Sequence, residues 1–149
     1  MKIASIDYGL NTGLVLGEIQ VKKKKVVLSG IVSMTIYDDI LQVVELIETY
    51  KCISIVLEQC PTLSTGAARE PFDKICMKLK EKGWLRGNSI REKHRVKHIG
   101  PGLWKPFMKK QQTDLSILEL HTVHEKDAMK MLWYAVQIAW KDKKVVLHV

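Results

Sequence analysis

The sequence predicts one α/β domain over residues 1–149, in which helices flank a mixed five-stranded sheet. Three observations lead to this fold class. Three short apolar segments near the N-terminus form a meander. The segment Cys52–Leu57 is almost continuously apolar, which is typical of a strand covered on both faces. Strand and helix patterns then alternate to the C-terminus, which favours parallel pairing of the later strands.

The meander begins with a strand at Ile3–Ile6, which ends in Asp7 and in a turn marked by Gly9, Asn11 and Gly13. Strands at Leu14–Val21 and Val26–Met34 follow. The polar segment Lys22–Lys25 between them predicts an antiparallel hairpin with a cationic end. These lysines could contact a phosphate backbone or keep an exposed sheet end soluble.

The first helix is expected after Asp38 or Asp39, either of which can cap it, and before Lys51. Its apolar face consists of Ile40, Val44 and Ile47, widened by Leu41 and Val43. The apolar strand Cys52–Leu57 follows and ends, like the first strand, in an acid, Glu58.

A flexible loop is expected at Pro61–Ala68, followed by a helix that begins near Pro71 and stops at Gly83. The apolar face of this helix consists of Phe72, Ile75, Cys76 and Leu79. A short strand is predicted at His94–Ile99, and the segment Gly100–Gly102 is expected to interrupt regular secondary structure after it.

The C-terminal part contains one clear helix, Val123–Trp140, and Thr122 and Glu125 have the spacing of a capping box at its start. Trp104–Lys110 fits either a helix or an ordered loop. The apolar segment Val145–Val149 does not reveal whether it pairs as a strand.

Composition narrows the functional class. The chain is 46% hydrophobic and 27% charged, as in folded soluble proteins, and its formal net charge of +8 indicates an anionic partner. Nucleic acid is the first candidate, an acidic membrane surface the second, and simple solubility the third. The sequence has no apolar segment long enough to span a membrane and no signal peptide, so we expect a cytoplasmic protein. Its three cysteines lack metal-type spacing and are expected to be reduced thiols.

Four side chains could carry chemistry. Asp7 and Glu58 each end a strand, and parallel pairing of those strands would place them side by side at the carboxyl edge of the sheet. His124 and Asp127 are three residues apart in the first turns of the last helix, so they share a face. Taken singly, each residue also has an ordinary structural role. Asp7 could cap a turn, Glu58 could pair with a lysine, and His124 and Asp127 could be ordinary residues of a first helical turn.

Gathered carboxylates repel unless a cation joins them, and oxygen-rich clusters suit Mg²⁺ or Mn²⁺. Two such ions in one site would clamp the attacking and leaving oxygens of an in-line phosphodiester displacement. The helix dipole favours a neutral His124, which could bind metal or accept a proton from water.

The chain resembles the RuvC-like Holliday junction resolvases of the ribonuclease-H-like superfamily, including their short phage versions. The matching stretches are IASIDYGLNTG at Ile3–Gly13, IVLEQCP at Ile55–Pro61 and HEKDAMKMLWYA at His124–Ala135. The resemblance implies a ribonuclease-H-like fold and a homodimeric, metal-dependent endonuclease of DNA recombination and repair, in a bacterial or phage-infected cell. It also implies that four residues bind the metal ions: Asp7, Glu58, His124 and Asp127.

The chain also departs from that family. The turn after Asp7 is one residue shorter than usual. Cys60 and Pro61 stand where many resolvases have an aromatic wedge, and His124 stands where many have a third acid.

A basic region between positions 69 and 110 supports the same function, because only Glu70, Asp73, Glu81 and Glu92 oppose its positive charges. Lys105 is the first choice for a lysine near the scissile phosphate, and Lys97 is the second. The residues expected to contact DNA are Lys74, Lys78, Lys82, Arg86, Lys97, Lys105, Lys109 and Lys110. Trp84 and Trp104 could stack on unpaired bases, although packing is the more ordinary role.

The expected substrate is branched DNA, above all a four-way junction. Three alternatives remain. The first is a binding protein of the same fold without catalysis. The second is a ribonuclease H acting on RNA–DNA hybrids, in which Glu45 or Glu48 of the first helix would replace Glu58. The third is an actin-like ATPase, but 149 residues are too few for its two domains.

Overall fold

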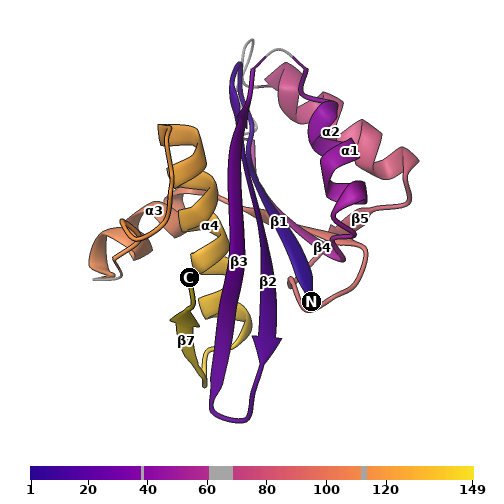
Figure 1. Cartoon of the computed structure of the whole chain (residues 1–149). Helices are drawn as coiled ribbons and strands as arrows, with labels where there is room; N and C mark the ends of the chain where they lie inside the picture. The colour runs from indigo at the N-terminus through magenta and orange to yellow at the C-terminus, as the bar shows by residue number, and fades with distance from the viewer. Residues whose placement is uncertain (38, 61–68, 112–113) are drawn as a thin grey trace.

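The fold is a seven-stranded sheet with helices on both faces, in a computed structural model that describes residues 1–37, 39–60, 69–111 and 114–149. The strand order is β5-β6-β4-β1-β2-β3-β7. Helices α1 and α2 cover one face, and α3 and α4 cover the other (Figure 1). The predicted mixed sheet is therefore confirmed, whereas the predicted count of five strands is wrong.

Five strands lie where the sequence places them. β1 (Lys2–Asp7), β2 (Thr12–Val21) and β3 (Lys25–Ile36) form the antiparallel meander. β4 (Ser54–Glu58) pairs in parallel with β1 on one side and with β6 (Arg95–Ile99) on the other. The meander strands are longer than predicted, because they continue into the polar residues at their ends.

The two additional strands form the edges of the sheet. β5 (Leu85–Gly87) pairs in parallel with β6, and β7 (Lys144–Leu147) pairs in parallel with β3. β5 is three residues long, and Leu85 and Arg86 are both exposed. It therefore carries no alternating pattern, and only its neighbour β6 makes it a strand.

The helices are α1 (Gln42–Thr49), α2 (Arg69–Glu81), α3 (Pro101–Lys110) and α4 (Val123–Ala139). α1 has no side-chain cap. Asp39 instead accepts a hydrogen bond from the Leu41 amide at 3.2 Å, in the turn before the helix. Asp38 and the predicted loop at 61–68 lie outside the described residues.

The segment predicted as a break is in fact the start of α3. Gly100 is extended and Pro101 occupies the first helical turn, where its missing amide and fixed φ cost nothing. Trp104–Lys110 is accordingly helical rather than an ordered loop. Gly83 does end α2 as predicted, with φ +90.

Residues of the central strands alternate between two apolar cores. Ile3 and Val56 pack with α4, and Ala4 and Leu57 pack with α1 and α2. This alternation fixes the direction of every side chain at the strand ends, including the candidate site residues. Within the described residues, no helix is long and apolar enough to cross a membrane.

Candidate active site

Asp7 and Glu58 lie at the same end of two neighbouring parallel strands. The register pairs Ile6 with Leu57, and each acid is the next residue along its strand. The parallel pairing on which the sequence argument depended is therefore confirmed. Ser5, two residues before Asp7, donates a hydrogen bond of 2.6 Å to the Ala128 carbonyl of α4. Alternation along the strands directs both acids to this α3–α4 face.

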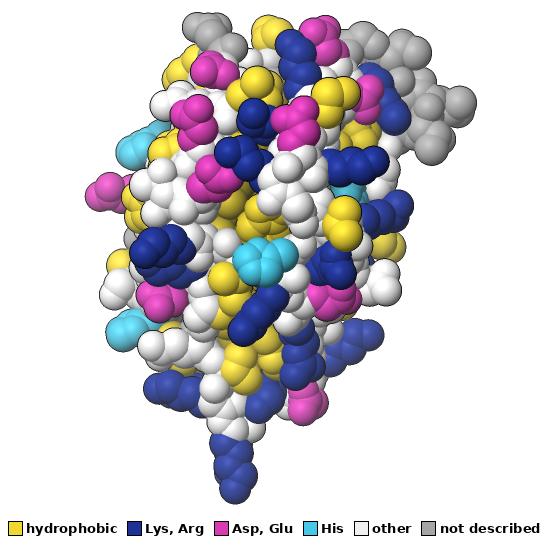
Figure 2. Space-filling model, turned by 90° about the vertical axis from the view of Figure 1, so that its right-hand side faces the viewer, with side chains coloured by type: hydrophobic (Ala, Val, Ile, Leu, Met, Phe, Trp, Pro, Cys, Tyr) yellow, Lys and Arg dark blue, Asp and Glu magenta, His cyan; other side chains and the backbone are white. Residues whose placement is uncertain are grey.

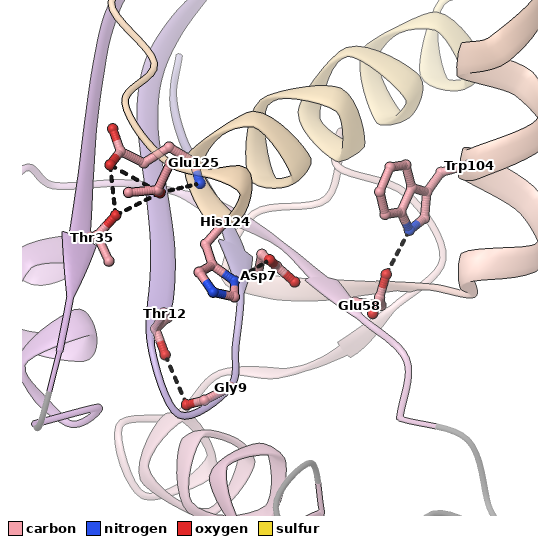
Figure 3. A network of polar contacts seen from close by, with 9 residues as sticks. Asp7, Gly9, Thr12, Thr35, Glu58, Trp104, His124 and Glu125 are labelled. Carbon is pink, nitrogen blue, oxygen red and sulfur yellow. Dashed lines mark hydrogen bonds and ion pairs between the residues drawn. The ribbon is translucent and has the colours of Figure 1, made fainter.

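The start of α4 brings His124 to Asp7. Thr122 caps the helix by accepting a hydrogen bond from the Glu125 amide at 3.1 Å. His124 Nδ1 lies 3.1 Å from Asp7 Oδ2, and in its Nδ1–H tautomer the ring donates to the carboxylate (Figure 3). Asp127, one turn further on, is close enough to affect the pKa values of Asp7 and Glu58.

Glu125 completes the anchoring of this helix. Its side chain is buried and accepts a hydrogen bond of 2.6 Å from Thr35 on β3 and one of 3.2 Å from Thr122 (Figure 3). In a capping box, this carboxylate would accept a hydrogen bond from the backbone amide of Thr122. Here it accepts one from the backbone amide of His121 instead. Glu125 thus does more than the predicted capping box, because it ties the start of α4 to the sheet.

Gly13 also positions α4. The sequence predicts Gly13 in the turn, but it lies in β2 directly opposite Asp7. A Cβ atom at this position would overlap the backbone of His124 and Glu125. Only a glycine therefore allows the first turn of α4 to approach the sheet closely enough to place the His124 ring beside Asp7.

Glu58 has a partner that the sequence analysis missed. The indole N–H of Trp104 donates a hydrogen bond of 2.7 Å to Glu58 Oε2 (Figure 3). The ammonium of Lys105 lies 5.4 Å from the Trp104 ring centre, and its charge acts on Glu58. Trp104 is only 2% exposed, so it packs rather than stacking on bases, and Trp84 is buried likewise in the opposite core. Helix periodicity alone offered no signal for the Trp104–Glu58 contact.

The electrostatics of the site favour a cation. Burial raises the pKa of Asp7 to about 6, the hydrogen bond from His124 lowers it, and the charges of Asp127 and Glu58 raise it further. Burial also raises the pKa of Glu58, against the opposing effects of Trp104 and Lys105. The site thus holds more negative charge than its protein partners neutralise.

The donor set fits Mg²⁺ or Mn²⁺ in its chemistry, since it offers carboxylate oxygens and one imidazole. As the side chains lie, Asp7 faces His124 and Glu58 faces Trp104. No three His, Cys, Asp or Glu side chains are gathered closely enough to hold a metal in the parts of the chain that the structure describes. Binding an ion would therefore require rotation of these side chains.

The raised pKa of Asp7 predicts a pH-dependent stability in EDTA. Between about pH 4 and 6 the folded protein retains a proton that the unfolded chain has lost, so this contribution to the unfolding free energy falls as pH rises. Over this range, the unfolding free energy of the wild type should fall by up to about 3 kcal/mol relative to that of Asp7→Asn. Urea unfolding at several pH values measures the difference. The exposed control Asp142→Asn should follow the wild type, and parallel curves for Asp7→Asn and wild type would contradict the burial argument.

The predicted DNA-contacting residues divide between two faces. On α2, Lys74 pairs with Glu70 and Lys78 with Glu81, while Lys82 pairs with Glu48 of α1. Figure 2 shows this face, where acidic side chains lie among the basic ones. The predicted cationic stripe is therefore partly neutralised.

The remaining predicted residues make no ion pairs among the described residues. Lys105, Lys109 and Lys110 are exposed on α3, on the same face of the sheet as Asp7 and Glu58. Arg86 is exposed on β5, and Lys97 is half-buried on β6. Of the α3 lysines, Lys105 acts by its charge on Glu58.

Comparison with protein-family models and with curated proteins found no match. Comparison with solved structures found RuvC from Thermus thermophilus, with a TM-score of 0.63 and 16% identity over 97% of this chain and 99% of that one. The T. thermophilus RuvC complex with a Holliday junction substrate also gives 0.63, at 14% identity over 95% of both chains. The Fowlpox virus resolvase, in complex with substrate Holliday junction DNA, gives 0.52 at 17% identity over 93% of this chain and 99% of that one. The chain therefore has the RuvC-like ribonuclease-H fold that the sequence resemblance implied.

Proposed function

We propose, starting from the RuvC-like fold, that this chain is a metal-dependent endonuclease that cuts branched DNA, with the four-way junction as its main substrate. The observation that carries the proposal is the meeting of Asp7 and Glu58 at one sheet edge, with His124 in contact with Asp7. The neighbours of known structure include two solved with Holliday junction DNA. Two symmetric cuts in a junction require two active sites, so we infer a homodimer.

The residues have distinct roles in this proposal. Asp7, Glu58, His124 and Asp127 would hold Mg²⁺ or Mn²⁺, as two ions in each active site. Bound ions of this kind supply charge stabilisation to the phosphate and lower the pKa of water. Lys105 would hold the scissile phosphate, because its charge already acts on Glu58. His124, which contacts Asp7, could alternatively accept a proton from the attacking water.

The ribonuclease H alternative requires a carboxylate from the first helix. α1 lies on the face opposite the candidate site, and its Glu48 is held by Lys82 at 3.1 Å. This placement favours Glu58 as the second acid. Separate substitution of Glu58 and Glu48 tests the choice, and loss of cleavage in Glu48→Gln but not in Glu58→Gln would support the ribonuclease H layout.

The proposal is tested by a cleavage panel of duplex, fork, flap, four-way junction and RNA–DNA hybrid, with Mg²⁺ or Mn²⁺ and with mapping of the products. Paired symmetric nicks confined to the junction are the expected result. Equal cutting of every branched substrate would indicate a general debranching nuclease. Tight junction binding without cleavage under either metal would leave the alternative of a non-catalytic binding protein.

Trp104→Phe should slow junction cleavage about tenfold, because Glu58 loses a charge-assisted hydrogen bond. Without this donor the pKa of Glu58 should rise further, so the acidic limb of the pH–rate profile should move to higher pH. Single-turnover rates across pH measure both effects. Trp84→Phe is the matched control, since it truncates a buried tryptophan in the opposite core. A pH profile of Trp104→Phe that coincides with that of Trp84→Phe would exclude a positioning role.

A further inference from the structure

A cavity of about 450 Å³ opens beside the candidate site, and no sequence pattern predicts it. It lies between β6, α3, the C-terminal half of α4 and the segment 88–91. Its polar side chains include Arg91, Lys97 and Lys141, and none of the described residues that line it is an aspartate or glutamate.

The charge of this cavity is positive and uncompensated. None of Arg91, Lys97 and Lys141 makes an ion pair with a described residue. Arg91 is held in place, because Nη1 donates to the Ala139 carbonyl at 3.4 Å and the guanidinium lies 5.4 Å from the Trp140 ring centre. These contacts orient the guanidinium without neutralising it. The cavity therefore suits an anionic ligand.

Apolar side chains line much of the rest of the cavity, together with the polar residues Asn88, Ser89 and His98. Ile90 and Ile99 form its buried floor, and Tyr134 lies on its wall. Leu103 and Ile138 also line it, although they are 62% and 38% exposed. Exposed apolar side chains beside unpaired cations match a ligand that has both a flat apolar surface and a negative charge, as a nucleotide does.

The cavity adjoins the candidate site through residues of β6 and α3. Ile99 pairs with Glu58 across the β4–β6 register. Leu103 immediately precedes Trp104, which donates to Glu58. Lys97 and Ile99 are two residues apart on β6, so both face the α3–α4 side of the sheet. A DNA strand with its scissile phosphate at Glu58 and Lys105 can therefore place a neighbouring nucleotide in the cavity.

We propose that this cavity binds one unpaired nucleotide of the DNA substrate. The base lies against Leu103, Ile138 and Tyr134. The phosphate contacts Lys97, Arg91 and Lys141. The inference rests on the proposed function, because it takes branched DNA as the substrate.

The test measures binding in EDTA, so that it does not depend on cleavage. The probes are labelled four-way junctions with one unpaired thymidine near the branch point, moved step by step along one strand. Each probe has a twin in which the unpaired nucleotide is abasic. The protein variants are Leu103→Glu and Lys97→Gln. Their controls are Met77→Glu, which is 65% exposed on α2 of the opposite face, and Lys24→Gln at the hairpin end.

At one position, loss of the base should weaken wild-type binding about fivefold or more. Leu103→Glu should abolish this difference between thymidine and abasic probes, and Met77→Glu should retain it. Lys97→Gln should weaken binding of both probes more than Lys24→Gln does. Circular dichroism and thermal melting check that each variant is folded.

Three outcomes would overturn the inference: equal binding of thymidine and abasic probes at every position, full base dependence in Leu103→Glu, or a Lys97→Gln effect no larger than that of Lys24→Gln. A changed oligomeric state of Leu103→Glu with unchanged DNA binding would also overturn it, in favour of an interface with a second copy. Base-dependent binding without cleavage in Mg²⁺ would reject the nuclease function and retain the cavity. Junction cleavage without base-dependent binding would reject nucleotide binding in the cavity and retain the nuclease function.

Discussion

Asp7→Asn should bind a four-way junction but cut it about a hundredfold more slowly, or not at all. The amide keeps the shape of the carboxylate and removes its charge. Asp7 lies at the centre of the site, in contact with His124 and within range of the charges of Glu58 and Asp127. Loss of the Asp7 charge should therefore weaken cation binding more than substitution of any other proposed metal ligand. Single-turnover cleavage of a labelled junction, with Mg²⁺ and with Mn²⁺, measures the effect.

Two controls separate this effect from misfolding. Asp142→Asn removes an exposed carboxylate outside the candidate site and should leave the cleavage rate unchanged. In EDTA, Asp7→Asn should be as stable as the wild type or more stable near pH 7, because it removes a buried charge. Wild-type cleavage by folded Asp7→Asn protein would show that the proposed site is wrong.

Local sequence patterns predicted the central sheet well, because burial on one or both faces leaves a period that the sequence displays. The edges of the sheet were less predictable. Leu85–Gly87 becomes a strand only through its neighbour β6, and Lys144–Leu147 only through β3. The start of α3 was misread because Gly100 and Pro101 are typical of a break and of a helix start alike.

The sequence predicts which acids form the candidate site, but not which side chains hydrogen-bond to them. Asp7 and Glu58 follow apolar strands, and His124 and Asp127 share a helix face, which are local features. The hydrogen bond from Trp104 to Glu58 joins residues 46 positions apart, and no periodicity reports it. The ion pair between Lys82 and Glu48 is similarly distant in sequence. The pairs Lys74–Glu70 and Lys78–Glu81 are local, and their helical spacing could have shown that the cationic stripe on α2 is partly neutralised.

Gly13→Ala should reduce both stability and cleavage, although it changes no residue that we assign to metal or DNA. The added Cβ would overlap backbone atoms of His124 and Glu125, which have no flexible end that could move aside. The first turn of α4 must then shift away from β2. We expect a loss of about 1–3 kcal/mol in unfolding free energy, as for other overpacked sites. Urea unfolding and junction cleavage measure the two effects.

Gly17→Ala is the matched control, because Gly17 lies in the same strand. Its Cβ would meet the end of the Ile31 side chain at 2.8 Å, and a side-chain end can rotate away. Gly13→Ala should therefore cost more in both measurements, and its cleavage defect should exceed its stability loss, since His124 moves relative to Asp7. Equal effects of the two substitutions would mean that close packing of α4 on β2 does not position His124. A cleavage defect restricted to Gly13→Ala would show that a residue without a side chain sets the geometry of the site.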